Sequence, residues 1–82
     1  MDLLRFVGVV LRLLVEGGEQ YGLQLVRASD GAVKRGTVYV LLSRMEDEGL
    51  IASRAVQDPY ASGMPRRLYR ATRHGRAQLR SA

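Results

Sequence analysis

The 82-residue chain contains no cysteine, no tryptophan and a single histidine. Without cysteine it can form neither disulfides nor thiolate metal sites, and His74 cannot build a metal site alone. Long apolar runs are also missing, because Arg5 and Arg12 interrupt the stretch 3–15, which is too short to span a bilayer. We therefore expect no cofactor, no metal, no membrane segment and a cytoplasmic protein.

Acidic residues are absent from Pro59 to the C-terminus, a stretch that holds six of the arginines, while the whole chain carries a net charge of +5. Such one-sided positive charge is typical of proteins that bind a polyanion, usually nucleic acid. A solvated arginine-rich tail is the alternative interpretation. The acidic cluster 46–48 is interpreted as the solvated end of a helix. No cysteine, second histidine or pair of acids offers a base and a nucleophile, so an enzyme is not predicted.

Apolar residues recur at helical spacing in three segments. The first, 3–15, is apolar around most of its girth and ends at Gly17-Gly18, so we expect burial on more than one side. A second helix is predicted from about Tyr21 to Ser29, followed by a turn. A third is predicted from Thr37, as N-cap, to just before Gly49.

After the third helix the pattern changes to that of strands. Residues 50–56 and 67–71 are the two candidates, and the turn-rich segment 58–65 between them predicts a hairpin with a long tip. Tyr69 is the better core candidate of the second strand. Thr72 is the predicted N-cap of a last helix, from Arg73 to about Ser81. This order predicts a mostly helical α+β fold, a winged helix-turn-helix, as one domain over 1–82.

A winged helix binds DNA through its third helix, which fits the major groove, and through its hairpin, the wing. Lys34 and Arg35 precede that helix. Tyr39 lies on the face of the helix that points away from its apolar residues, and a large aromatic side chain there indicates contact with a partner. Packing over the helix rim is the alternative for Tyr39. The predicted DNA-binding residues are Lys34, Arg35, Gly36, Thr37, Tyr39, Ser43, Arg44, Gly63, Arg66 and Arg67.

Three segments resemble the PadR family of winged-helix transcription regulators. Residues 36–51, GTVYVLLSRMEDEGLI, are similar to the family's G-T-I/V-Y-P-L-L-x-R-L-E-x-E-G-L-I. Residues 65–76, PRRLYRATRHGR, resemble its P-R-R/K-x-Y-x-L/I-T-x-x-G-R/K, and YGLQL at 21–25 is close to H-G-Y-E/Q-L/I. The chain departs from the family at Val40, where proline is usual, and at Tyr21 and Leu23, which replace histidine and tyrosine.

The resemblance implies a homodimer that reads an inverted repeat, with half-sites about 34 Å apart, and that represses by covering a promoter. Family members dimerise through a longer C-terminal helix, whereas this chain stops about ten residues into its last helix. We therefore expect the first helix to contribute the dimer contacts, through Leu3, Leu4, Val7 and Leu11. A small-molecule effector is not indicated. The alternative function is a winged helix that binds proteins within a larger assembly.

Overall fold

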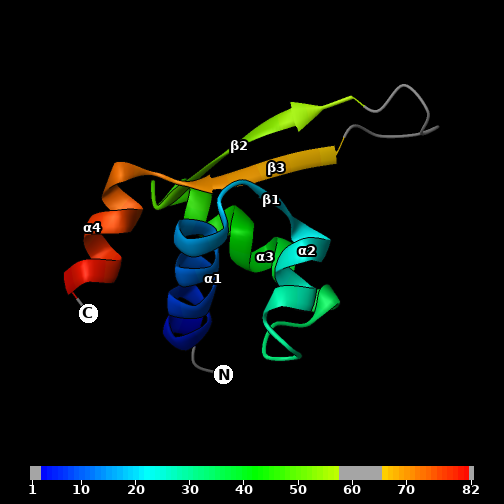
Figure 1. The fold of residues 1–82 in the computed structure, drawn as a ribbon, viewed down its shortest axis with the longest axis horizontal. Coiled ribbons are helices and arrows are strands. Elements are labelled where there is room, and N and C mark those ends of the chain that lie inside the picture. The colour runs from blue at the N-terminus through cyan, green and yellow to red at the C-terminus, as the bar shows by residue number, and fades with distance from the viewer. Residues whose placement is uncertain (1–2, 58–65, 82) are drawn as a thin grey trace.

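The computed structural model describes residues 3–57 and 66–81, with side chains from residue 5 onward. In Figure 1 the helix α1 stands near the centre and α4 lies at one end, while the strands run above the helices toward the other end. The elements follow the order α1, β1, α2, α3, β2, β3, α4. The predicted order of three helices, two strands and a last helix is confirmed, with one additional short strand, β1.

The first helix, α1, spans Leu3–Gly17 and turns one side into the core. Val10, Leu11 and Leu14 on that side are at most 2% exposed. The helix ends where predicted because Gly18 has a φ of 75°, which glycine adopts without a Cβ clash. The Gly18 amide donates to the carbonyl of Leu14 at 3.0 Å, so this turn is closed by the backbone itself.

Two further helices, α2 (Gly22–Ala28) and α3 (Arg35–Asp47), form the helix-turn-helix. The predicted turn after α2 is present. Gly31 has a φ of 91°, and the Ser29 hydroxyl accepts a hydrogen bond from the amide of Val33 at 3.0 Å. This turn brings α3 back across α2, so that the two helices share one apolar interior.

The start of α3 differs from the prediction. Thr37 is not the N-cap, as predicted, but the third residue of the helix, and the N-cap is Lys34 in an extended conformation. The amides of Thr37 and Val38 donate to the Lys34 carbonyl at 3.0 and 2.9 Å. The helix begins earlier than predicted because Val33, the residue before the N-cap, is buried in the core at 1% exposure. Its burial fixes where the backbone turns into α3.

The strands β1 (Gln20–Tyr21), β2 (Ile51–Val56) and β3 (Arg66–Ala71) form an antiparallel sheet in the order β1-β3-β2. Ser53 pairs with Tyr69 in the β2–β3 hairpin. The sequence did not predict β1, because two residues are too few to show alternation. Its pairing with β3 ties the chain between α1 and α2 to the base of the wing.

The last helix, α4, spans Arg73–Ser81. Its predicted N-cap is confirmed, since the Thr72 hydroxyl accepts a hydrogen bond from the Gly75 amide at 3.0 Å. The same hydroxyl lies 2.6 Å from the carbonyl oxygen of Gly49, to which it donates. A Cβ on Gly75 would collide with the carbonyl oxygen of Leu50. The first turn of α4 therefore packs directly against the backbone that joins α3 to the sheet.

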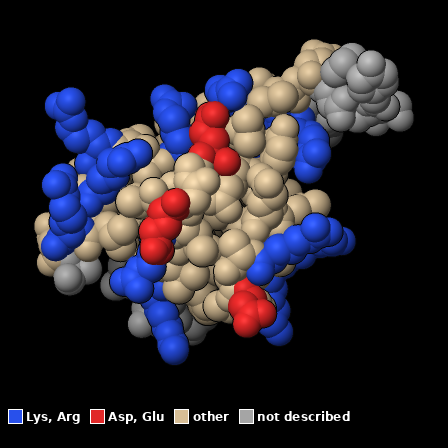
Figure 2. Space-filling view, in the orientation of Figure 1, with Lys and Arg blue, Asp and Glu red and all other residues tan. Residues whose placement is uncertain are grey.

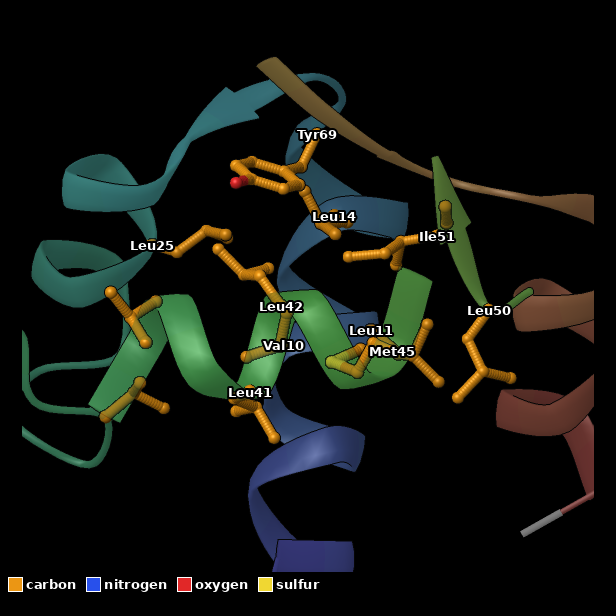
Figure 3. Close-up of a cluster of buried hydrophobic side chains, with 13 residues drawn as sticks. Val10, Leu11, Leu14, Leu25, Leu41, Leu42, Met45, Leu50, Ile51 and Tyr69 are labelled. Atoms are coloured by element: carbon orange, nitrogen blue, oxygen red, sulfur yellow. The ribbon is translucent and has the colours of Figure 1, made fainter. Parts of the chain in front are cut away.

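Figure 3 shows how α3 contributes to the core. Leu41, Leu42 and Met45, all at most 1% exposed, point toward buried side chains of α1, α2 and the sheet. Tyr69 is 7% exposed, which confirms it as a core residue. Among the described residues, every buried side-chain nitrogen and oxygen has a hydrogen-bond partner. Because the core covers only one side of α3, the other side faces solvent.

Candidate nucleic-acid interface

The outer face of α3 carries large side chains that the core does not cover. Tyr39 is 50% exposed and Val40 is 63% exposed, and Ser43 and Arg44 are exposed beside them. Tyr39 and Ser43, and likewise Val40 and Arg44, are four residues apart, and Val40 and Ser43 are three apart, so the four lie on one side of the helix. An α-helix with an uncovered face of this kind fits the major groove of B-DNA, which is about 12 Å wide.

The N-terminus of α3 is suited to a phosphate group. Its N-cap, Lys34, makes no side-chain capping hydrogen bond, and the first turn contains no acidic residue. Lys34, Arg35 and Gly36 are all exposed. The amides at the start of a helix and the positive end of its dipole favour an anion, and two cationic side chains here add to that field.

The wing begins with two exposed arginines, Arg66 and Arg67. The Arg66 guanidinium lies 4.0 Å from the centre of the Tyr21 ring, a cation–π contact that joins β3 to the start of α2. The Arg67 Nε donates a hydrogen bond to the Ser53 hydroxyl at 3.0 Å. Each contact engages one part of the guanidinium, the face of Arg66 and the Nε of Arg67, and leaves terminal N–H groups to meet a phosphate.

These arginines line a cleft of about 430 Å³ where the wing, α2 and α3 meet; its walls are Tyr21, Gly22, Leu23, Tyr39, Arg66, Arg67 and Tyr69. Tyr39 packs closely on α2, since a Cβ on Gly22 would lie 2.7 Å from its Cε1. The ring therefore lies over a neighbouring helix and still leaves half of the side chain exposed, so contact of Tyr39 with a partner stays a prediction.

A short hydrogen-bond chain runs beside this cleft. The Ser53 hydroxyl lies 2.8 and 3.0 Å from the two carboxylate oxygens of Glu46 and donates to that carboxylate. Glu46 is half-buried, so its interpretation as part of a solvated helix end is wrong. Burial, and next the Glu46 charge, raise the pKa of Tyr69 above its ordinary value.

The opposite face of the sheet carries a separate ion pair. Arg54 donates to both carboxylate oxygens of Glu19, at 2.9 and 3.0 Å. This hydrogen bonding lowers the pKa of Glu19 and raises that of Arg54. Figure 2 shows basic side chains over the α4 end and along the sheet on one face, with smaller acidic patches between them. Positive charge therefore extends well beyond the cleft.

The structure leaves most of the predicted DNA-binding residues exposed, at the start and on the outer face of α3 and at the start of β3. The α3 residues and their flanks are exposed except Thr37, which is half-buried beside Val33 in a small pocket that includes Phe6. The wing arginines lie across the cleft from Tyr39. Gly63 lies outside the described residues.

The residues predicted for dimer contacts separate into different environments. Leu11 is 2% exposed and packs mainly within the chain's own core, although it also lines the groove between α1 and α4, so its role as a subunit contact stays a prediction. Its helical spacing to Leu14 and Val15 places it on the side of α1 that packs in the core of the single chain. Val7 is half-buried and lines a groove of about 380 Å³ between α1 and α4. The side chains of Leu3 and Leu4 lie outside the described ones.

Three further side chains belong to the candidate interface, although they are not among the DNA-binding residues predicted from the sequence. Val40 is the most exposed large apolar residue of α3, and Tyr21 and Leu23 form one wall of the cleft. The available signal was their departure from the family pattern at all three positions. Ser53 gave no signal, because a serine in a strand has no distinctive spacing.

Within residues 3–57 and 66–81, no helix is long and apolar enough to cross a membrane. The same part of the chain holds no group of three His, Cys, Asp or Glu side chains that could bind a metal ion.

Comparison with known proteins gives a consistent result. The model of the Transcriptional regulator PadR-like family matches residues 10–81. No curated protein matches the sequence. A solved PadR family transcriptional regulator from Eggerthella lenta is 32% identical, with a TM-score of 0.72, and the match covers 95% of this chain and 70% of that one.

Two solved structures have still higher structural similarity. A PadR-like transcription factor from Bacteroides fragilis has a TM-score of 0.83 at 24% identity, covering 96% of this chain and 77% of that one. PadR from Bacillus subtilis, crystallised in complex with operator DNA, has a TM-score of 0.81 at 22% identity. That match covers 93% of this chain and 45% of the Bacillus protein, so the chain spans less than half of its length. These likenesses show a winged-helix fold.

Proposed function

Because the chain belongs to the PadR-like family of transcriptional regulators, we propose that it binds duplex DNA in a sequence-specific manner and regulates transcription. The outer face of α3 enters the major groove, where Tyr39, Ser43 and Arg44 meet base edges. Lys34 and Arg35, with the amides at the start of α3, meet phosphates on one side of the groove.

The main support is the position of the wing arginines relative to α3. Arg66 and Arg67 line the same cleft as Tyr39. The positive charge of the wing therefore lies next to the exposed face of α3. A duplex with its groove on α3 then brings its backbone against the wing. The Bacillus subtilis relative, crystallised with operator DNA, has the same fold, which makes duplex DNA the first ligand to test.

We further propose that the regulator acts as a homodimer through α1 and α4. The apolar side chains of α1 that the core leaves half-covered include Phe6, Val9 and Leu13. The groove between α1 and α4 is lined mainly by carbon, from residues such as Val7 and Leu79. A second copy that covers this groove would bury apolar surface that the single chain leaves to water.

A twofold dimer places two recognition helices in successive major grooves, about 34 Å apart on one side of the duplex. Its operator is therefore an inverted repeat, and a bound dimer represses by covering promoter sequence. Contacts to base edges set the sequence of each half-site, while the arginines and lysine add affinity that does not depend on sequence.

The test is a binding titration with a labelled duplex at several salt concentrations, followed by selection of bound sequences from a random duplex pool. If roughly six phosphates are neutralised, log affinity falls with log salt with a slope near −5. Enriched sequences should contain an inverted repeat. An absence of binding to any duplex at low salt would refute the proposed function, and enrichment of an unsymmetrical site would refute the dimer.

A further inference from the structure

The chain of contacts from Glu46 through Ser53 to Arg67 joins the two elements proposed to bind DNA. Glu46 lies near the C-terminal end of α3, Ser53 lies in β2, and Arg67 lies in β3 of the wing. The hydroxyl of Ser53 donates to the carboxylate and accepts from the guanidinium Nε, so its hydrogen-bonding capacity is used in both directions.

Strand alternation explains why these groups meet. Ser53 pairs directly with Tyr69, and Ala55 pairs with Arg67, so the side chains of all four point to the sheet face that packs on the helices. Nearer the helices this face carries buried Tyr69, whereas Arg67 stands at its outer end and is exposed. The polar chain therefore begins where the apolar core ends.

The serine also keeps two opposite charges apart. Among the described residues, Arg54–Glu19 is the ion pair, and no direct bond joins Arg67 to Glu46. A direct bond would fix the guanidinium against the carboxylate and neutralise much of its attraction for phosphate. With the hydroxyl between them, Glu46 orients Arg67 through Ser53, and only the Nε of the guanidinium is occupied by that contact.

We propose that Ser53, anchored by Glu46, is a positioning residue that aims the Arg67 guanidinium at the DNA backbone beside the α3 groove. This inference rests on the proposed function. These two hydrogen bonds, from Ser53 to Glu46 and from Arg67 to Ser53, form a relay. Through it, a residue of α3 sets the direction of an arginine side chain in the wing. The direction of Arg67 in the wing is then fixed relative to α3 before DNA binds. Less side-chain freedom is therefore lost on binding.

The first test is a double-mutant cycle of Ser53→Ala and Arg67→Ala, measured as the Kd for a labelled duplex at fixed salt. Loss of one hydrogen bond to a charged group that remains partly solvated predicts Ser53→Ala binding about three- to tenfold more weakly. In the Arg67→Ala background the same substitution should change Kd less than about twofold, because the group it positions is gone. Equal losses in both backgrounds, or none in either, would overturn the inference.

The second test separates positioning from simple charge. Glu46→Ala and Glu19→Ala each remove one carboxylate bonded to a side chain of β2, on opposite sheet faces. Electrostatics alone predicts tighter binding for both, since each removes a charge that repels phosphate. The relay predicts that Glu46→Ala weakens binding about two- to fivefold while Glu19→Ala does not, and that Glu46→Gln, which keeps an acceptor oxygen and loses the charge, binds at least as tightly as wild type. Tighter binding by Glu46→Ala would overturn the inference.

The Arg67 Nε–Hε signal in ¹⁵N-resolved NMR spectra of the free protein reads the relay without DNA. It should be well dispersed in the wild type and move toward the position of exposed arginines in Ser53→Ala. A wild type that binds no duplex would refute the proposed function. Wild-type binding with an unaltered Ser53→Ala variant would refute only the positioning role.

Discussion

Replacement of Gly75 by alanine gives opposite expectations from local propensity and from packing. In a helix interior, alanine is favoured over glycine by about 1 kcal/mol. The added Cβ, however, would collide with the carbonyl oxygen of Leu50 and come within 3.1 Å of the Leu11 Cδ2. A backbone oxygen cannot rotate away, so α4 must move, and its N-cap bond from the Gly75 amide to Thr72 moves with it.

The packing effect should win. Overpacking of a tight contact costs about 1–3 kcal/mol, and a clash with backbone belongs at the upper end of that range. Subtracting the propensity gain leaves a net loss of about 2 kcal/mol in the free energy of unfolding. For a domain of this size, about 2 kcal/mol lowers the Tm by about 8–16 °C. Thermal unfolding followed by far-UV circular dichroism measures this directly.

Gly8→Ala is the matched control. Gly8 lies in the interior of α1, whereas Gly75 lies in the first turn of α4, and a Cβ on Gly8 meets nothing within 4 Å. Within the single chain only the propensity gain applies, so this variant should unfold at a Tm that is about 4–8 °C higher when both variants are compared as monomers. A Gly75→Ala variant that is as stable as Gly8→Ala would show that α4 does not pack on the Leu50 backbone as described.

Three further predictions concern DNA binding and assembly. The double variant Arg66→Ala, Arg67→Ala should weaken binding to every duplex and reduce the salt slope by about 2, since two phosphate contacts are lost; an unchanged slope would remove the wing from the interface. Tyr39→Ala should cost about 1–3 kcal/mol more on the selected site than on random duplex, and equal losses would show that Tyr39 reads no sequence. Val7→Glu should sediment as a folded monomer, whereas an unchanged dimer would contradict the α1–α4 interface.

The helices and the hairpin were predictable because their signals are local. Spacing of apolar residues places α1 and α3, glycine at a positive φ ends α1, and a threonine caps α4. The errors are local as well. Threonine is a common N-cap residue, but burial of Val33 starts the helix before Thr37. N-cap preferences depend on the residue type alone and do not include whether a neighbouring residue is buried.

The candidate interface was predictable in its charged parts and not in its architecture. Lys34, Arg35 and the wing arginines stand out in the sequence because no acid balances them nearby. The cleft is different, since Tyr21, Tyr39 and Arg66 are far apart along the chain and meet only when β1 pairs with β3. A two-residue strand leaves no pattern to detect, so neither its pairing nor the cleft could be foreseen.

The apolar spacing and the turn-rich segment by themselves determined the class of fold, the asymmetry of charge marked the hairpin as basic, and the motifs at 21–25, 36–51 and 65–76 carried the resemblance to PadR regulators. Tertiary structure decided which of those residues are available. It buries Leu11, which the sequence offered to a partner, and it draws Glu46 from an acidic helix end into a bond with Ser53. Periodicity and charge are properties of neighbours along a chain, whereas exposure and hydrogen bonding depend on which distant segments pack together.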